Sequence, residues 1–114
     1  MVNPTAIERV IEGLMGYNPE KIILFGSMAR GDADEYSDID LIVVKETDQR
    51  FVQRLVDAGS FIPPHLSVDV LVYTPDELKI MVEDGNPFIE KALKEGKVIY
   101  EKPTGNGSAV AGPS

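Results

Sequence analysis

The sequence of 114 residues contains no cysteine. Disulfide bonds and thiolate metal sites are therefore excluded, and a reducing cytoplasm is the expected compartment. The sequence also lacks an apolar run long enough to span a bilayer, and its first residues, MVNPTAIERV, lack the apolar core of a signal peptide. We expect a soluble cytoplasmic protein that does not insert into a membrane.

Positive charge is scarce as well. Nineteen acidic residues against eleven basic ones give a net charge of -8. This is the wrong sign for a surface that binds the phosphates of nucleic acids, so direct nucleic-acid binding is not expected. The excess of acidic residues can serve solubility alone, so it does not by itself indicate a function.

The apolar pattern predicts one α/β domain, because segments with strand character alternate with segments of helical periodicity. Proline, glycine and capping residues mark most of the boundaries; one example is the capping box formed by Thr74 and Glu77. Helices are expected from Asn3–Pro4 to Gly16, over 27–30, from Thr47 to Gly59, from Thr74 onward and from Asn86–Pro87 to Gly96. Strands are expected over 21–25, 38–45, 66–73 and 97–100, and helices are expected to cover the sheet.

The last twelve residues differ from the rest of the chain. From residue 103 the sequence reads PTGNGSAVAGPS, which is small, turn-forming and has nothing to bury. We therefore expect a single domain over residues 1–102 and a flexible tail over 103–114.

The stretch SDIDLIVV at residues 37–44 places two carboxylates at the start of an apolar strand. Side chains alternate along a strand, so Asp38 and Asp40 point to the same face. The next strand repeats the anomaly, because Asp69 lies between Val68 and Val70. Burying an unpaired carboxylate costs on the order of several kcal/mol, so three such groups on neighbouring strands would each protonate or demand a cation.

Two sources of that cation are open. Arg30 and the lysines could form structural ion pairs with the carboxylates. A divalent ion serves better, because carboxylate oxygens suit Mg²⁺, which also leaves room for the phosphates of a substrate. A calcium loop is excluded, because Tyr36, Ser37 and Val43 occupy positions that such a loop gives to a ligand, a glycine and a glutamate.

Gly26 and Ser27 form the turn between the first predicted strand and the short helix SMAR. A helix start favours anions, glycine allows a phosphate to approach the backbone, and the serine hydroxyl can donate to a phosphate oxygen. A plain turn capped by Ser27 is the simpler alternative. Arg30 can contact a phosphate or steady the helix by pairing with Asp38 or Asp32.

Taken together, these elements resemble the signature of the DNA polymerase beta-like nucleotidyltransferase superfamily, and especially its smallest prokaryotic members. The elements are Gly26–Ser27, Ala29–Arg30–Gly31, Ser37–Asp38–Ile39–Asp40–Leu41 and the later Asp69, and the similarity extends over about residues 1–102. The resemblance implies a mixed sheet of about four strands with helices against it. It also implies that Asp38, Asp40 and Asp69 hold Mg²⁺, with two ions expected, and that Gly26 and Ser27, with Arg30, bind the triphosphate of ATP or another NTP.

The same resemblance implies an activity. An acceptor hydroxyl would attack the α-phosphorus of the nucleotide and pyrophosphate would leave, with Asp69 as a base or a metal ligand. The chain has no separate region for an acceptor, so a partner is expected to supply it. In small members of this superfamily the partner is often a separate helical toxin of the HEPN type, and the resemblance implies that a nucleotidyltransferase that adenylylates it acts as the antitoxin.

Two other functions remain open at this point. The chain could neutralise a toxin by binding alone, with catalysis incidental. It could also modify a small molecule, although the absence of an acceptor region counts against this. The remaining polar candidate, His65, is interpreted as a loop residue because Mg²⁺ prefers oxygen ligands.

Overall fold

The computed structural model describes residues 4–31 and 38–103 of the chain. The predicted helix cap Asn3, the candidate ion-pair partner Asp32 and all but the first residue of the predicted tail lie outside the described residues. Nine helices and strands follow one another in the described part of the chain: α1 (Pro4–Met15), β1 (Lys21–Phe25), α2 (Ser27–Arg30), β2 (Ile39–Val44), α3 (Phe51–Gly59), β3 (Val68–Tyr73), α4 (Pro75–Glu83), α5 (Pro87–Glu95) and β4 (Lys97–Glu101).

The four strands form one mixed sheet in the order β3-β2-β1-β4. β1 pairs antiparallel with both β2 and β4, whereas β2 and β3 run parallel. A parallel pair needs a crossover connection, and the segment that contains α3 supplies it. The predicted mixed sheet of about four strands is confirmed.

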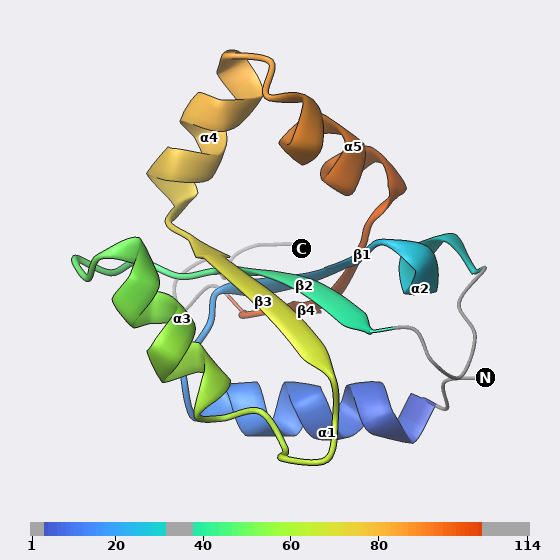
Figure 1. The fold of residues 1–114 in the computed structure, drawn as a ribbon. Helices are drawn as coiled ribbons and strands as arrows, with labels where there is room; N and C mark the ends of the chain where they lie inside the picture. Colours follow the sequence, from blue (N-terminus) through green and yellow to red (C-terminus); the bar gives the residue numbers. More distant parts are fainter. Residues whose placement is uncertain (1–3, 32–37, 104–114) are drawn as a thin grey trace.

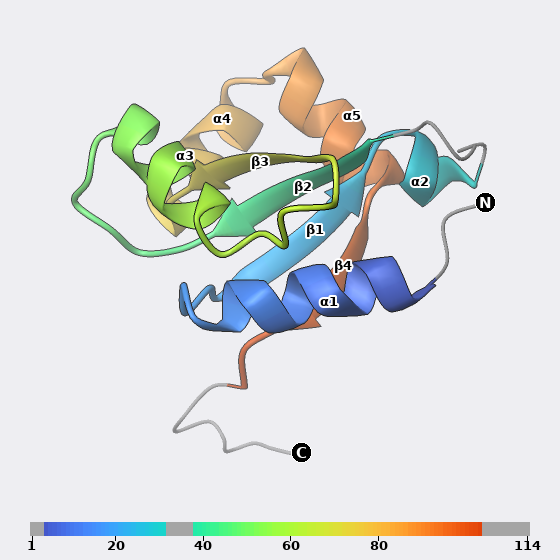
Figure 2. The same ribbon diagram turned by 60° about the horizontal axis from the view of Figure 1, so that its bottom comes forward.

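Helices cover both faces of the sheet (Figures 1 and 2). On one face α1 and α3 pack against alternate residues of the strands, among them Ile22, Leu41 and Val72. On the other face α4 and α5 pack against the intervening residues, such as Ile23 and Ile42. β2 therefore has apolar residues on both sides, as its sequence predicts for a central strand. In the described part of the chain, no helix has the length and apolar character that a membrane span requires.

Capping residues explain where two of the helices begin. The Thr74 side chain accepts a hydrogen bond from the backbone N–H of Glu77, and the Glu77 side chain accepts one from the backbone of Thr74, which is the predicted capping box. Asn86 caps α5 by accepting from the backbone N–H of Ile89 at 3.1 Å. Both predicted starts are confirmed.

The prediction that a helix opens at Thr47 is wrong. Thr47 instead accepts a hydrogen bond from the backbone N–H of Gln49 at 3.1 Å and forms a local turn, and α3 begins at Phe51. The apolar residues of this segment are also less buried than their spacing suggests. Val52 and Val56 are 71% and 61% exposed.

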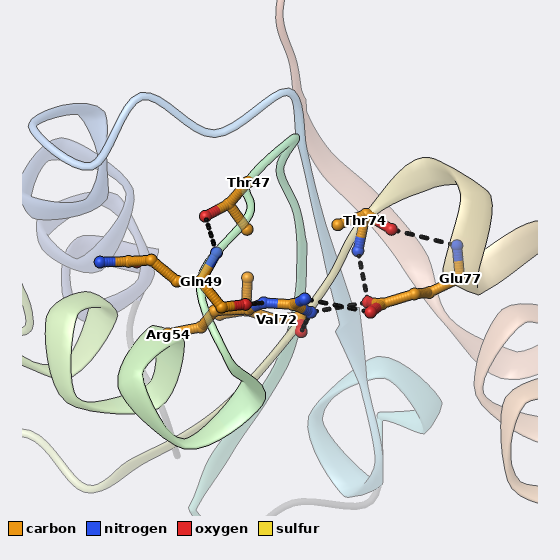
Figure 3. A network of polar contacts seen from close by, with 6 residues as sticks. All are labelled: Thr47, Gln49, Arg54, Val72, Thr74 and Glu77. Carbon is orange, nitrogen blue, oxygen red and sulfur yellow. Dashed lines mark hydrogen bonds and ion pairs between the residues drawn. The ribbon is translucent and has the colours of Figure 1, made fainter.

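Arg54 is the buried charge of α3, and it links that helix to β3 and α4 (Figure 3). Its Nη1 and Nη2 donate to the two carboxylate oxygens of Glu77 at 2.6 and 3.0 Å, and Nη1 also donates to the carbonyl of Val72 at 3.2 Å. Its Nε donates to the carbonyl of Gln49 at 2.8 Å. A buried guanidinium is tolerated here because its donors are matched.

Candidate active site

Strand register brings the predicted carboxylates together at one end of the sheet, where β1 ends and β2 and β3 begin. Asp40 on β2 lies directly beside Asp69 on β3 in the parallel pairing, and it faces Phe25 across the antiparallel pairing with β1. Asp38 immediately precedes β2. The alternation of side chains places Asp40 and Asp69 on the face that α4 and α5 cover farther along the strands.

The carboxylates are more exposed than the sequence argument requires. From the sequence we expect three carboxylates removed from water, and this prediction is wrong for two of them: Asp38 and Asp69 are exposed, and only Asp40 is half-buried. The reason is their place at the rim of the sheet, with Asp69 on the edge strand β3. Burial alone therefore does not demand a cation at Asp38 or Asp69.

Electrostatic crowding is nevertheless present at Asp40. Burial raises the pKa of its carboxyl group, and the negative charges of Asp69 and Asp38, together with a hydrogen bond to Asp69, raise it further. The positive charge of Arg30 opposes these effects. The site therefore holds negative charge that Arg30 offsets only in part.

Gly26 packs against this carboxylate. Its backbone has φ 77° and ψ -156°, a conformation that is essentially restricted to glycine. A Cβ atom added to Gly26 would collide with Oδ2 of Asp40. Gly26 of the predicted Gly–Ser turn therefore lies against Asp40, which neither spacing nor composition alone could establish.

The short helix α2 follows Gly26 directly, so Ser27 is its first residue, as predicted. Its last residue, Arg30, forms an ion pair with Glu95 at the end of α5, with 3.4 Å between Nη1 and Oε1. The sequence does not predict this pairing with Glu95, because the two residues are 65 positions apart and meet only in the folded chain. Arg30 still acts on Asp40 through its charge.

Among the described residues, no group of three or more carboxylate or histidine side chains is arranged as a ready-made metal site. The chemistry of the donors does fit Mg²⁺, because carboxylate oxygens are its preferred protein ligands. Like charges that meet repel one another unless a cation lies between their oxygens. Asp38, Asp40 and Asp69 therefore suit Mg²⁺ by donor type and by their place on adjoining strands, and their role as ligands stays a prediction.

The sequence analysis missed Ser67, whose hydroxyl donates a hydrogen bond to Oδ1 of Asp38 at 2.6 Å. A signal was present in the sequence. Ser67 and Asp69 have the same two-residue spacing as Asp38 and Asp40, at the start of the neighbouring strand. Once the two strands are known to run parallel in that register, this spacing places Ser67 beside Asp38.

A hollow of about 570 Å³ lies at the opposite end of the sheet from the candidate site, and none of the predicted site residues lines it. Two lysines at this hollow already have partners. Lys45 donates to the carbonyl of Tyr17 at 2.7 Å, and Lys102 donates to Oδ1 of Asn18 at 3.1 Å. We assign no chemistry to this hollow.

Comparison with known families identifies a match over most of the chain. The family model described as "Polymerase beta, Nucleotidyltransferase" matches residues 8–104. Two proteins of Methanocaldococcus jannaschii are similar in sequence. The one named "Putative protein adenylyltransferase MJ0604" is 35% identical over 81 residues, which are 71% of this chain and 78% of that protein. The one named "Putative protein adenylyltransferase MJ1305" is 33% identical over 87 residues, which are 71% of this chain and 58% of that protein.

Solved structures share the fold. A crystal structure described as a "putative nucleotidyltransferase from Sulfolobus solfataricus" superimposes with a TM-score of 0.55 at 23% identity and covers 89% of this chain and 91% of its own. A structure of the toxin–antitoxin pair MntA–HpeT gives 0.54 at 20% identity, covering 90% and 75%. A toxin–antitoxin structure with AMP-PNP gives 0.52 at 22% identity, covering 89% and 75%. At these identities the three structures establish the likeness of the fold alone.

Proposed function

The chain belongs to the polymerase beta family of nucleotidyltransferases, and on that premise we propose that it transfers AMP from ATP to a hydroxyl group of a partner protein. The observation that carries this proposal is the close approach of Gly26 to Asp40. Gly26 lies against Asp40, and Asp40 lies beside Asp69. A nucleotide whose triphosphate binds at the turn would thereby have its phosphates next to the carboxylates.

Each residue of the site has a role in this proposal. The backbone at Gly26 and the hydroxyl of Ser27 bind the triphosphate, and Arg30 adds positive charge on the same side. Asp38, Asp40 and Asp69 hold Mg²⁺, the metal that the family implies. When bound, Mg²⁺ would neutralise the phosphate charge and lower the pKa of the attacking hydroxyl.

The transfer itself is a substitution at phosphorus. The acceptor oxygen forms a bond to the α-phosphorus, while the bond from that phosphorus to the bridging oxygen breaks and pyrophosphate leaves with the electron pair. The proton of the acceptor hydroxyl is passed to Asp69. Asp69 suits this role because it is exposed on the edge strand, where an acceptor can reach it.

The known proteins support the choice of substrates. Both relatives of M. jannaschii are named as protein adenylyltransferases, which favours ATP as donor and a protein as acceptor. Two solved structures of the same fold are toxin–antitoxin structures, and one of them contains AMP-PNP. We propose that the acceptor is a helical toxin of the HEPN type and that its modification in the cytoplasm makes this chain the antitoxin.

The test is transfer of label from ATP to the partner. The protein is incubated with α-³²P-labelled ATP, Mg²⁺ and the product of the neighbouring reading frame, and labelled protein is resolved by electrophoresis. We expect label on the partner, and we expect the double variant Asp38→Asn plus Asp40→Asn to reduce its rate of labelling at least about 100-fold.

A matched control keeps the charge change and moves it away from the site. Asp48 and Asp84 are exposed carboxylates outside the site, so Asp48→Asn plus Asp84→Asn removes the same charge there. This control should label the partner at the rate of the original protein. Equal labelling by both double variants would remove Asp38 and Asp40 from the mechanism.

Exposed apolar side chains on α3 and α4 favour a second candidate function, neutralisation of the toxin by binding alone. Besides Val52 and Val56 on α3, Ile80 on α4 is 55% exposed. Between these helices lies a groove of about 260 Å³ lined by Phe51, Tyr73, Glu77, Ile80 and Met81. If binding is sufficient, the Asp38→Asn plus Asp40→Asn variant will rescue cells from the toxin at full strength. If transfer is required, the same variant will not rescue.

A further inference from the structure

Ser67 makes two contacts that join the start of β3 to the start of β2. Its hydroxyl donates to Oδ1 of Asp38 at 2.6 Å, and its carbonyl accepts the backbone N–H of Ile39 at 3.0 Å. The first contact holds a side chain and the second holds the backbone next to it. Asp38 is thereby fixed to the strand that carries Asp69.

The Asp38 carboxylate needs such a restraint. It is exposed and precedes the first residue of β2, so few packing contacts limit its rotamers. Asp38 and Asp40 are two residues apart at the start of β2, so their side chains point to the same face and their like charges repel each other. An unrestrained Asp38 would turn away from Asp40 into solvent. The Ser67 hydroxyl opposes this with a short hydrogen bond to a charged acceptor, which is stronger than one to a neutral group.

A serine suits this task better than a cation. A lysine or arginine at position 67 would hold the carboxylate by neutralising it, and the charge would no longer be available to a metal. The serine hydroxyl occupies one lone pair of Oδ1 and leaves Oδ2 and the full negative charge unused.

We infer that Ser67 is a positioning residue, which holds Asp38 in the orientation that Mg²⁺ requires and so sets the metal affinity of the site. This inference rests on the proposed function. Hydrogen bonds to metal-binding carboxylates orient them, and loss of such a partner typically weakens metal binding or activity about 10–100-fold. Ser67 itself touches neither substrate nor metal in this assignment.

Mn²⁺ alone, without nucleotide, is the probe for the test, because free Mn²⁺ is counted directly by electron paramagnetic resonance. The Ser67→Ala variant should raise the dissociation constant for Mn²⁺ about tenfold. The Ser67→Thr variant keeps a hydroxyl at the same carbon, and β-branched residues suit extended backbone, so it should bind Mn²⁺ within about twofold of the original protein. Ser67 is exposed, so both variants should fold, and thermal unfolding checks this.

A second readout separates metal binding from nucleotide binding. In the labelling assay, Ser67→Ala should raise the Mg²⁺ concentration needed for half-maximal rate about tenfold, with the KM for ATP at saturating Mg²⁺ nearly unchanged. A residue that merely supports the strand would alter thermal stability and leave this Mg²⁺ requirement unmoved.

The outcomes distinguish a failure of the role assigned to Ser67 from a failure of the proposed function. If the original protein binds Mn²⁺ and labels its partner while Ser67→Ala matches it in Mn²⁺ affinity, the role of Ser67 is overturned and the proposed function stands. Equal weakening by Ser67→Ala and Ser67→Thr also overturns the role, because the hydroxyl is then irrelevant. If the original protein neither binds Mn²⁺ nor transfers label, the proposed function fails first, and the role of Ser67 fails with it.

Discussion

The two ends of β3 place carboxylates in opposite electrostatic settings. At its start, Asp69 lies beside Asp40, whose pKa is raised by burial and by the negative charges around it. Just beyond its end, Glu77 accepts two hydrogen bonds from the buried Arg54, and chiefly because of this contact its pKa is lowered. A crowded carboxylate, Asp40 on the neighbouring strand β2, thus lies at one end of β3, and a matched one, Glu77 on α4, follows the other end.

The opposite pKa shifts of Glu77 and Asp40 predict opposite effects of pH on the free energy of unfolding. The lowered pKa of Glu77 means that its contribution is present above its ordinary value of 4.5 and is lost as the pH falls through the lowered value. The raised pKa of Asp40 means that its contribution is present below its ordinary value of 3.8 and is lost as the pH rises through the raised value. At neutral pH the Glu77 end stabilises the fold, whereas the Asp40 end costs stability and keeps charge available for ligands.

Removing the ion pair between Arg54 and Glu77 should have the largest effect on the stability of the fold. Arg54→Ala removes the buried cation, so Glu77 keeps only the backbone N–H of Thr74 as a donor and the carbonyl of Val72 loses its side-chain donor. Because the Glu77 side chain is 43% exposed, its charge stays partly solvated, and the free energy of unfolding should fall by about 2–4 kcal/mol. Urea denaturation measures this change. Since Arg54 lies at the far end of β3, the fraction that remains folded should keep its transfer activity.

Arg50 provides the control for this prediction. It lies four residues before Arg54 and is exposed, so Arg50→Ala should change stability by no more than about 0.5 kcal/mol. Equal losses from the two variants would show that Arg54 acts through its helix in general and not through Glu77.

The crowded end can be perturbed without changing its charge. Gly26→Ala forces a side chain into a backbone conformation reserved for glycine and against Asp40, which should lower stability by about 2–3 kcal/mol and abolish transfer. Gly31 also has a positive φ, 85°, but a Cβ there meets nothing within 4 Å. Gly31→Ala should therefore lower stability by only about 1 kcal/mol and preserve most activity. Thermal unfolding and the labelling assay together separate backbone strain from the collision with Asp40.

The sequence predicts the helices and strands better than it predicts the ion pair at the Glu77 end of β3. Strands and most helix boundaries follow from apolar runs, prolines and side-chain caps, and the structure confirms them. The start of α3 is missed because Arg50, the residue before the helix, makes no side-chain cap that could mark it. The Arg54–Glu77 pair is missed because its members are 23 residues apart and meet only after the crossover has formed.

For the site, alternation along one strand predicts that Asp38 and Asp40 point to the same face, whereas the position of Asp69 beside Asp40 depends on the register of β2 and β3. Alternation does not predict the exposure of these carboxylates, because that depends on how far α4 and α5 extend over the face. The contact of Gly26 with Asp40 and the bond from Ser67 to Asp38 depend on strand register, which no local pattern encodes. The metal-binding and nucleotide-binding roles of Asp38, Asp40, Asp69, Gly26, Ser27 and Arg30 stay predictions.

The smallest expected effect is an increase in the free energy of unfolding. Asp40→Asn removes the crowded charge with little change of shape, so at pH 7 and low salt it should raise the free energy of unfolding by about 0.5–1 kcal/mol while abolishing transfer. Asp48→Asn, at an exposed position outside the site, should give no such gain. Urea denaturation at a series of pH values measures both.

The pH dependence of this gain identifies its cause. The advantage of Asp40→Asn should vanish below about pH 3, where Asp40 of the original protein is itself protonated and neutral. Added Mg²⁺ should stabilise the original protein and leave the variant unchanged, because a ligand stabilises only the form that binds it. A gain that persists at low pH would come from packing instead of charge. It would then remove the contrast between the two ends of β3, because Asp40 would no longer carry an electrostatic cost that a bound cation relieves.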